Sequence, residues 1–344
     1  MRFTGIHRIL RSIYRRWSNP EENPMTIRHM TACYIQNKIY LWRHSLPAIQ
    51  VPFGFAVDAP PVPPRLAVIV HCFYPDLMEE ILAHLRHIPF PFALYVSTDT
   101  EEKRTDLLRQ IARTSIRDAE VRLATNRGRD IGPKYITFRD VYDHCDYFLH
   151  LHSKKSPHTG TWGDEWRRYL LHTLAGSPEI VCSNVRLLDD PRIGVVFPVP
   201  IEDKIPYLRW GANFDVSSAL ARRLGIQIRP EFCLDYPSGS MFWGKTSVLR
   251  PLLDLGLTFD DMPPEKGQLD GCINHAIERM VIYCACKQGL SGCRVTTRSD
   301  YSNLWRAGDE RALTGAITSC LAAQEKERLT YDKPGRMSPL RSGP

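Results

Sequence analysis

Residues 65–152 alternate apolar runs with amphipathic segments, and this alternation restricts the possible folds more than any other feature. The runs RLAVIVHCFY (65–74) and DYFLHLH (146–152) have the continuity of strands that are buried on both faces. After the first run, PDLMEEILAHLRHI (75–88) carries apolar residues at helical spacing. The strand FALYVST, the helix EEKRTDLLRQIARTSI and the strand AEVRLATN follow. Successive strand–helix units predict an α/β fold with a doubly wound, mostly parallel sheet.

Polar side chains gather where these strands end, which is where doubly wound sheets bind ligands. The strand that ends in HLHSKK (150–155) brings imidazole and ammonium groups to this edge, and NRGRD (126–130) adds two guanidinium groups around a glycine. Such a group of donors and cations favours an anion, and a diphosphate fits it well. The candidate binding residues are His71, Tyr74, Thr98, Asp99, Asn126, Arg129, Asp130, His150, His152, Lys154 and Lys155.

His150 and His152 alternate with Leu151 and therefore share one face of the predicted strand. Two interpretations follow from this spacing. The imidazoles can donate hydrogen bonds to the anion, or they can be ligands of a metal ion. The metal site is incomplete, because no third ligand with a recognisable spacing lies nearby. We therefore predict no metal site, and a site with His150 and His152 as ligands is kept as the alternative.

The second half of the body supplies candidate catalytic and acceptor residues. EKGQLDGCINHAIERM (265–280) predicts a helix opened by Asp270 and Gly271, and an aspartate at a helix start is on its own an ordinary N-cap. Aromatic rings offer flat faces for a sugar, although core packing explains each of them equally well. The candidate acceptor or sugar contacts are Trp162, Asp164, Phe242 and Trp243.

Positive charge is concentrated at the N-terminus. Residues 1–50 hold eight basic and two acidic side chains, whereas the formal charge of the whole chain is only +7. The body is therefore nearly neutral, and no nucleic-acid partner is predicted. Residues 2–17 have apolar side chains at helical spacing opposite arginines, which is typical of a helix on an anionic membrane surface or of a helix packed on the domain. Scattered cysteines, and the absence of a signal sequence or a long apolar run, favour a cytoplasmic protein.

The chain divides into four predicted parts. Residues 1–50 form the basic N-terminal helical extension, and the proline-rich residues 51–64 form a linker. Residues 65–310 form a single main domain of two halves, residues 65–160 and residues 161–310. The polar residues 330–344 are predicted to be disordered.

Two resemblances follow from the motifs. The order of strand, STD, strand, NRGRD, strand and charged strand end resembles the nucleotide-sugar half of GT-A glycosyltransferases. The motifs HCFYPDL, NRGRDIGP, HLHSKKSPH, GDEWRRYLL, GSMFWGK and DGCINHAIERM resemble those of the rhamnan synthesis protein F family, in the same order from about Leu66 to Met280. The resemblance implies a GT-A-like fold and a glycosyltransferase that moves a sugar, most of all rhamnose from dTDP-rhamnose, onto a bacterial surface polysaccharide.

The resemblance also implies roles for single residues. It makes Asp270 the candidate base that deprotonates an acceptor hydroxyl, with Glu265 as the second choice. Arg129, Lys154 and Lys155 would bind the diphosphate, and Thr98, Asp99 and Asn126 would hold the base and ribose. GT-A enzymes carry a metal-binding Asp-x-Asp where this chain has His150-Leu151-His152, so dependence on Mg or Mn stays open. A lipid-linked glycan acceptor would place the protein at the inner face of the bacterial inner membrane.

Two other functions compete with this interpretation. A catalytically degenerate GT-A fold could bind a nucleotide sugar or a glycan within a membrane assembly complex, and the missing Asp-x-Asp is the best argument for it. Asp270 argues against it, because a pure binding protein needs no carboxylate facing the cationic edge. A metal-dependent hydrolase that uses His150 and His152 lacks a complete ligand set.

Overall fold

The computed structural model describes residues 46–54, 64–153, 155, 162–201, 208–229, 234–265, 270–298, 305–307 and 317. Three predicted segments therefore lie outside the described residues: most of the basic extension, most of the proline-rich linker and the tail from residue 330. Lys154 and the side chain of Trp162 also lie outside them.

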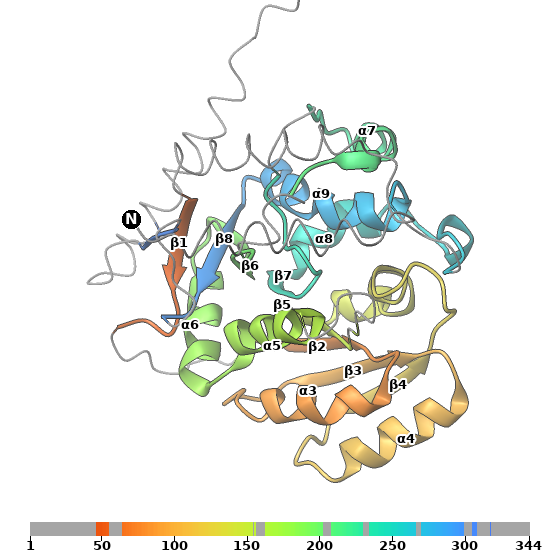
Figure 1. Ribbon diagram of the computed structural model, residues 1–344, viewed down its shortest axis with the longest axis vertical. Coiled ribbons are helices and arrows are strands. Elements are labelled where there is room, and N and C mark those ends of the chain that lie inside the picture. The colour runs from red at the N-terminus through yellow and green to blue at the C-terminus, as the bar shows by residue number, and fades with distance from the viewer. Residues whose placement is uncertain are drawn as a thin grey trace, which may run out of the picture.

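The described residues form one nine-stranded sheet with the order β4-β3-β2-β5-β7-β6-β8-β1-β9 (Figure 1). The strands are β1 (Leu46–Gln50), β2 (Leu66–His71), β3 (Ala93–Thr98), β4 (Ala119–Leu123), β5 (Tyr147–His152), β6 (Ile193–Pro198), β7 (Phe242–Lys245), β8 (Ser291–Thr296) and β9 (Trp305–Ala307). Only β7 runs antiparallel to its neighbours β5 and β6 among these strands. The mostly parallel α/β sheet predicted from the sequence is confirmed.

Helices cover both faces of the sheet (Figure 1). They are α3 (Met78–Leu85), α4 (Glu101–Ala112), α5 (Trp162–Ala175), α6 (Pro178–Leu188), α7 (Phe214–Arg223), α8 (Thr246–Leu253) and α9 (Ile273–Lys287). Local signals begin several of them: the Thr100 side chain accepts a hydrogen bond from the Lys103 N–H at the start of α4, and Ser177 does the same for Ile180 at α6. Between β4 and β5, the chain forms a π-turn, Pro133–Thr137, and a 3₁₀ turn, Arg139–Asp143.

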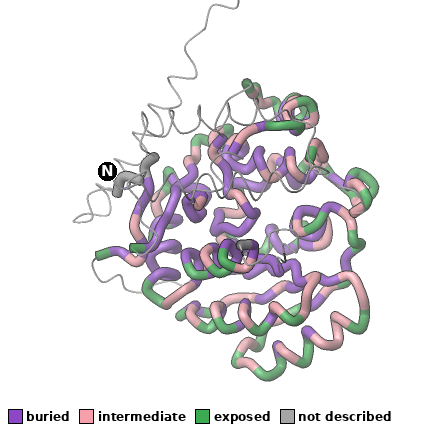
Figure 2. Tube along the Cα trace, viewed as in Figure 1, coloured by how far each residue is buried: buried purple, intermediate pink, exposed green. Residues whose placement is uncertain are grey.

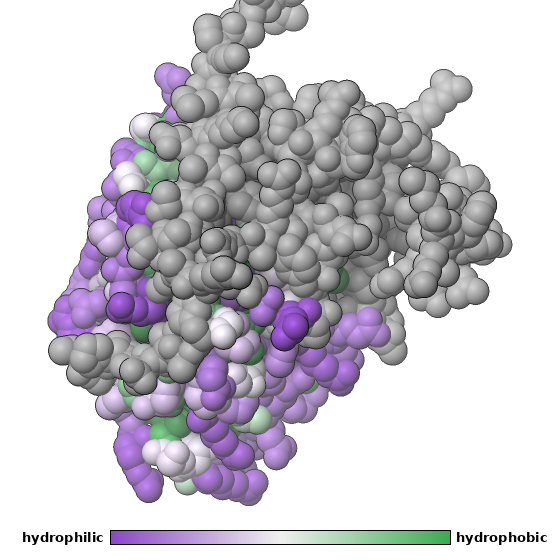
Figure 3. Space-filling view, turned by 90° about the vertical axis from the view of Figure 1, so that its left-hand side faces the viewer, coloured by the Kyte–Doolittle hydropathy of each residue, from purple (hydrophilic) through white to green (hydrophobic). Residues whose placement is uncertain are grey.

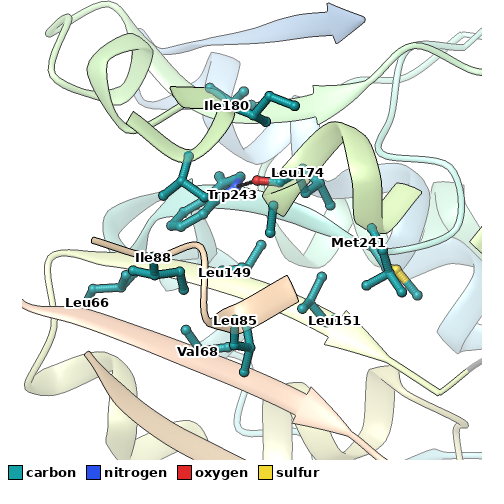
Figure 4. Close-up of a cluster of buried hydrophobic side chains, with 14 of the residues drawn as sticks. Leu66, Val68, Leu85, Ile88, Leu149, Leu151, Leu174, Ile180, Met241 and Trp243 are labelled. Atoms are coloured by element: carbon teal, nitrogen blue, oxygen red, sulfur yellow. Dashed lines mark hydrogen bonds between the residues drawn. The ribbon is translucent and has the colours of Figure 1, made fainter. Parts of the chain in front are cut away.

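The alternation of side chains along the central strands separates two hydrophobic cores. Leu149 and Leu151 of β5 pack with Val68, Leu85 and Leu174 on one face, as Figure 4 shows. Phe148 of β5 belongs to the other core, beneath α8 and α9. His150 and His152 continue the row of Phe148, so the strand turns its imidazoles toward the face that α9 covers. The purple tubes of Figure 2 mark both buried layers.

Strand β1 corrects the predicted boundary of the domain. It pairs in parallel with β8, with Ile49 opposite Val295, and the Val51 N–H continues the ladder by donating to the Thr296 carbonyl (2.8 Å). Val51 is fully buried and lies in the predicted linker. The sheet therefore begins at Leu46 and not at Arg65. LPAIQ is a five-residue run interrupted by proline, which gives it no recognisable strand pattern.

The surface of the described residues carries little exposed apolar area. Leu108 and Leu123 are the large hydrophobic residues exposed among them. On the face drawn in Figure 3, the described side chains are mainly hydrophilic. Within the described part of the chain, no helix combines the length and the hydrophobicity that crossing a bilayer requires.

Candidate functional site

Three imidazoles meet at the carboxyl ends of two adjacent strands. The register of β2 and β5 places His71 opposite His152 and Ile69 opposite His150, so all three rings lie on one face of the sheet. His150 is completely buried, and His71 and His152 are 9% and 6% exposed. The sequence prediction that these residues gather at one edge is consistent with this placement, but the rings lie below the surface.

Two of these imidazoles bind a backbone turn that precedes β7. His150 Nδ1 lies 2.5 Å from the Ser240 carbonyl oxygen, and His152 Nε2 lies 2.7 Å from that of Gly239. A carbonyl oxygen only accepts, so each ring nitrogen donates. Gly239 and Ser240 both have positive φ angles, 90° and 59°, and Ser240 is one of two non-glycine residues described with such a backbone. A positive φ costs free energy at Ser240, and the hydrogen bonds from the imidazoles offset part of that cost.

Lys134 completes this network, and sequence reasoning missed it. Its side chain is 1% exposed, and its Nζ donates to Ser240 Oγ (2.9 Å). The Gly239 N–H donates to Glu278 Oε1 of α9 (3.0 Å). The available signal was a lone lysine within the apolar stretch IGPKYITF. The turn at residues 239–240 is thus fixed by side chains from the 133–137 turn, β5 and α9.

Burial decides the charge of these groups. It lowers the pKa of His71 to about 4 and that of His150 well below its ordinary value, so both rings are neutral at pH 7. Burial also lowers the pKa of Lys134 to about 8, against the opposing charges of Asp130 and Glu278. Burial favours the neutral form of Asp130, but His152, His150 and Lys134 outweigh it and hold its pKa below the ordinary range. Because desolvation removes their protons, His71 and His150 carry no positive charge for an anion at pH 7.

The neutral His71 makes the fold sensitive to acid. Its folded pKa of about 4 is lower than the value of about 6.5 expected when unfolded, so below pH 6.5 protons favour the unfolded chain. The resulting loss of unfolding free energy grows as the pH falls toward 4, where it reaches about 3 kcal/mol, and then changes little. We expect His71→Gln to weaken the dependence of unfolding free energy on pH between 6.5 and 4, measured by urea denaturation. An unchanged slope would contradict this assignment.

The residues at the end of β5 do not fit the metal site that an Asp-x-Asp would form there. His150 and His152 each donate one ring nitrogen to a carbonyl oxygen of the turn. Across the described ranges, no group of three or more His, Cys, Asp or Glu side chains has an arrangement that could hold a metal ion. Among the described residues, His150 and His152 therefore lack a complete set of protein ligands for a metal ion.

The NRGRD loop is held in a left-handed conformation by Glu265. Gly128 and Arg129 have φ angles of 75° and 53°, and a side chain at Gly128 would lie 2.8 Å from Met262 Sδ. The Arg129 N–H donates to Glu265 Oε1 (2.7 Å), and Arg129 Nε lies 3.8 Å from Glu265 Oε2. The Arg129 side chain remains 47% exposed. Glu265, the second candidate base, is thus engaged in placing Arg129.

Asp270 is not the cap of helix α9. The helix begins at Ile273 after Cys272, so the cap interpretation is wrong, because Gly271 (φ 86°) turns the chain between Asp270 and the helix. Asp270 Oδ1 accepts a hydrogen bond from Asn213 Nδ2 (2.5 Å) and lies 3.7 Å from His275 Nδ1. Its side chain is 47% exposed. Asp270 therefore presents a carboxylate to solvent beside an imidazole.

The NRGRD loop and the start of α9 meet around His275. Burial lowers the pKa of His275, Arg129 and Arg279 act in the same direction, and Glu278 and Asp270 oppose them. Arg129 and Asp270 are therefore both close enough to His275 to affect its protonation. The Asp270 carboxylate thus lies beside His275, and the charge of the half-exposed Arg129 acts on the same imidazole.

The other residues predicted to bind the donor differ in exposure and in their existing side-chain partners. Asp99 binds Lys103 (2.6 Å), whose Nζ also lies 3.7 Å from the centre of the Phe73 ring. Lys155 pairs with Asp76 and lies 5.0 Å from the centre of the Tyr74 ring. Thr98 is completely buried, and its Oγ1 has no hydrogen-bond partner among the described residues. Asn126 is exposed.

Of the predicted acceptor or sugar contacts whose side chains are described, Phe242 and Trp243 lie in the core and Asp164 lies in an ion pair. Trp243 is fully buried on the face opposite His150, where its Nε1 donates to the Leu174 carbonyl (3.0 Å; Figure 4). Phe242 is fully buried beneath Lys134, with 4.8 Å between Nζ and the ring centre. Neither ring offers a surface to a sugar, because the strand places both between packed layers. Asp164 accepts a hydrogen bond from Arg167 (2.6 Å).

The fold and this edge define the class of protein: an α/β domain with a mostly parallel sheet and with polar and charged side chains at the carboxyl ends of its parallel strands. The model of rhamnan synthesis protein F matches residues 56–290, which is more than half of the chain. The chain belongs to the rhamnan synthesis protein F family. This confirms the family resemblance of its motifs.

Comparisons with individual proteins give the following relatives. The uncharacterized protein WxcX from two strains of Xanthomonas campestris pv. campestris is 34% identical over 239 residues. That match covers 68% of this chain and 33% of WxcX, so the chain spans about one third of the length of the curated relatives it matches.

Two solved structures show lower similarity. The mannosyltransferase PcManGT from Pyrobaculum calidifontis, in complex with GDP-Man and Mn²⁺, has a TM-score of 0.43 and 16% identity, covering 89% of this chain and 75% of its own. The mannosyltransferase Ktr4p from S. cerevisiae has a TM-score of 0.32 and 11% identity, covering 71% and 72%.

Proposed function

We propose that this chain is a glycosyltransferase that moves a sugar from a nucleotide-diphosphate donor to a hydroxyl of a growing bacterial surface polysaccharide. Membership of the rhamnan synthesis protein F family favours rhamnose as the sugar and dTDP-rhamnose as the donor. The observations that carry the proposal are the half-exposed Asp270 carboxylate beside His275 and the half-exposed Arg129, whose charge acts on the same imidazole. Sugar transfer needs a cation for the leaving diphosphate and a base for the acceptor, and these side chains supply one of each.

The proposed reaction is a single displacement at the anomeric carbon. Asp270 accepts the proton of the acceptor hydroxyl while the oxygen of that hydroxyl bonds to the anomeric carbon. The bond from that carbon to the diphosphate oxygen breaks, and its electron pair leaves with the nucleoside diphosphate. Arg129 stabilises the charge that develops there through charge-assisted hydrogen bonds. Glu265 keeps Arg129 in place through the backbone N–H.

A binding protein is the second candidate, and one observation favours it. His150 and His152, which stand where the resemblance expects an Asp-x-Asp, each donate a hydrogen bond to the backbone at residues 239–240. A GT-A-like domain that binds a nucleotide sugar or glycan without turnover could tolerate this. Release of a nucleoside diphosphate from a donor by the purified protein separates the two functions, and added Mg or Mn tests the metal dependence that the resemblance leaves open.

Arg129→Ala tests the diphosphate site. We expect affinity for dTDP to fall by about 10- to 100-fold, because the variant removes one or two charge-assisted hydrogen bonds of about 1.5–3 kcal/mol. Arg139→Ala is the matched control, since Arg139 is an exposed arginine on a neighbouring turn. Isothermal titration calorimetry with dTDP and UDP measures both variants. Equal affinity of Arg129→Ala and wild type would remove Arg129 from the site.

The basic segment gives a proposal about location. Residues 2–17 lie outside the described residues, and their arginines would bind anionic lipids at the inner face of the inner membrane, near lipid-linked acceptors. Co-sedimentation with vesicles of anionic lipid, compared with neutral vesicles, tests this attachment.

A further inference from the structure

Asn213 binds Asp270 in an unusual way for its position in the chain. It precedes helix α7, where asparagine commonly caps the first turn, but its side chain makes no capping hydrogen bond. The side chain is instead turned into the protein, where Asn213 is completely buried. One Nδ2 hydrogen is available for the Trp210 carbonyl (2.9 Å) and the other for Asp270 Oδ1 (2.5 Å).

The same amide also fixes the backbone that follows Asp270. Asn213 Oδ1 accepts a hydrogen bond from the Gly271 N–H (2.8 Å). Asn213 thus binds a side chain and the next peptide group at once, and its amide hydrogens and oxygen all have partners. This two-point contact fixes both the position of the residue and the direction of its carboxylate.

Close packing supports the same arrangement. Gly211 and Gly271 have φ angles of 54° and 86°. A side chain at Gly211 would lie 3.0 Å from Asp270 Oδ2, and one at Gly271 would lie 3.2 Å from the Ala212 carbonyl oxygen. The turn 211–213 and the loop 270–271 therefore pack directly on each other, with no side chain between them. The placement of Asp270 depends on this contact, because Asp270 lies outside helix α9.

The chemistry of the partner matters as much as its position. An amide orients a carboxylate without adding a positive charge, so it holds the group without neutralising it. An arginine at this position would lower the proton affinity of the carboxylate. His275, 3.7 Å away, is a further neighbour whose burial favours the neutral ring. The amide therefore orients the Asp270 carboxylate through hydrogen bonds and adds no formal charge to the site.

We propose that Asn213 is a positioning residue, which aims the carboxylate of Asp270 at the acceptor hydroxyl. The proposal rests on the proposed function, in which Asp270 is the base. It assigns a role in that function to the turn Gly211–Asn213, which precedes α7 and carries none of the residues predicted for the site from the sequence.

Asn213→Asp provides the sharpest test, because the side chains have nearly the same shape. The variant replaces the donor amide by a second carboxyl group next to Asp270, and two close carboxylates raise the pKa of one of them. We expect the acidic limb of the kcat/KM profile to move up by about one pH unit, and kcat at pH 7 to fall by about 10-fold or more. Donor affinity should stay within about 2-fold of wild type, because Arg129 is untouched.

Two further variants separate positioning from stability. Asn213→Ala removes the orientation without adding charge, so we expect a lower kcat with no shift of the acidic limb. Ser217→Ala is the matched control, since Ser217 lies one turn further along α7, is also completely buried, and has an Oγ without a hydrogen-bond partner among the described residues. It should leave kcat unchanged. If Asn213→Asp does not fold, the comparison of Asn213→Ala with Ser217→Ala still tests the positioning role of Asn213.

The outcomes distinguish this inference from the proposed function. If Asp270→Asn is inactive but both Asn213 variants keep the kcat and pH profile of wild type, the inference is wrong and the function stands. If Asp270→Asn keeps turnover, Asp270 is not the base, and the positioning role falls with it. If the Asn213→Ala variant had a lower melting temperature and an unchanged kcat, Asn213 would have only a structural role.

Discussion

Asp270→Asn is expected to lower the turnover number by about 10²- to 10⁴-fold, which is the usual contribution of a general base. The asparagine keeps the shape of the side chain but cannot accept a proton from the acceptor hydroxyl. Donor affinity should stay within about 2-fold, because the predicted diphosphate contact is Arg129. Steady-state kinetics gives the turnover number, and calorimetric titration with dTDP gives the affinity.

Asp254→Asn is the control for this experiment. Asp254 is exposed, follows α8 and carries the same substitution away from the site. We expect the turnover of this variant to equal that of wild type. If Asp270→Asn kept turnover within a few-fold of wild type, Asp270 would not be the base.

Lys134→Met is expected to lower the free energy of unfolding by about 3–5 kcal/mol, the usual cost of removing one partner of a buried charged network. Methionine fills the space of the lysine stem, so cavity formation contributes little. The loss comes from Asp130, which keeps its charge without the ammonium, and from Ser240, which loses its donor. Urea denaturation at pH 7 measures the change.

Two variants control the Lys134 experiment. Lys155→Met removes a lysine whose ion pair with Asp76 is largely exposed, and it should change the unfolding free energy by less than about 1 kcal/mol. The double variant Lys134→Met with Asp130→Asn removes both charges and should recover part of the loss. A change below 1 kcal/mol for Lys134→Met alone would show that the buried network does not stabilise the fold.

The sequence predicted the central part of the fold because that part is encoded locally. Continuous apolar strands, and helices with caps at Thr100 and Ser177, are recognisable within a short window of residues. The same strand ends identified His71, His150 and His152 as neighbours. Strand β1 could not be predicted, because its five residues become a strand only through pairing with β8, more than 240 residues later in the chain.

The site was harder to predict because its contacts join distant residues. Asn213 and Asp270 are 57 positions apart, and Lys134 and Ser240 are 106 apart, so no local pattern reveals either pair. The protonation of the histidines could not be predicted for a related reason. A sequence shows an imidazole at a strand end but does not show its burial, and burial decides whether the ring carries a proton.

The most direct measurement is a titration of the purified protein with dTDP-rhamnose, GDP-sugars and UDP-sugars, in EDTA and with Mg or Mn. Melting temperature reports binding, and released nucleoside diphosphate reports transfer to water or acceptor. We predict that one donor, with dTDP-rhamnose favoured, raises the melting temperature and is slowly cleaved, and that Asp270→Asn binds the same donor without cleaving it. A protein that binds a donor but releases no nucleoside diphosphate under any condition, or that binds none of them, would contradict the proposed transferase.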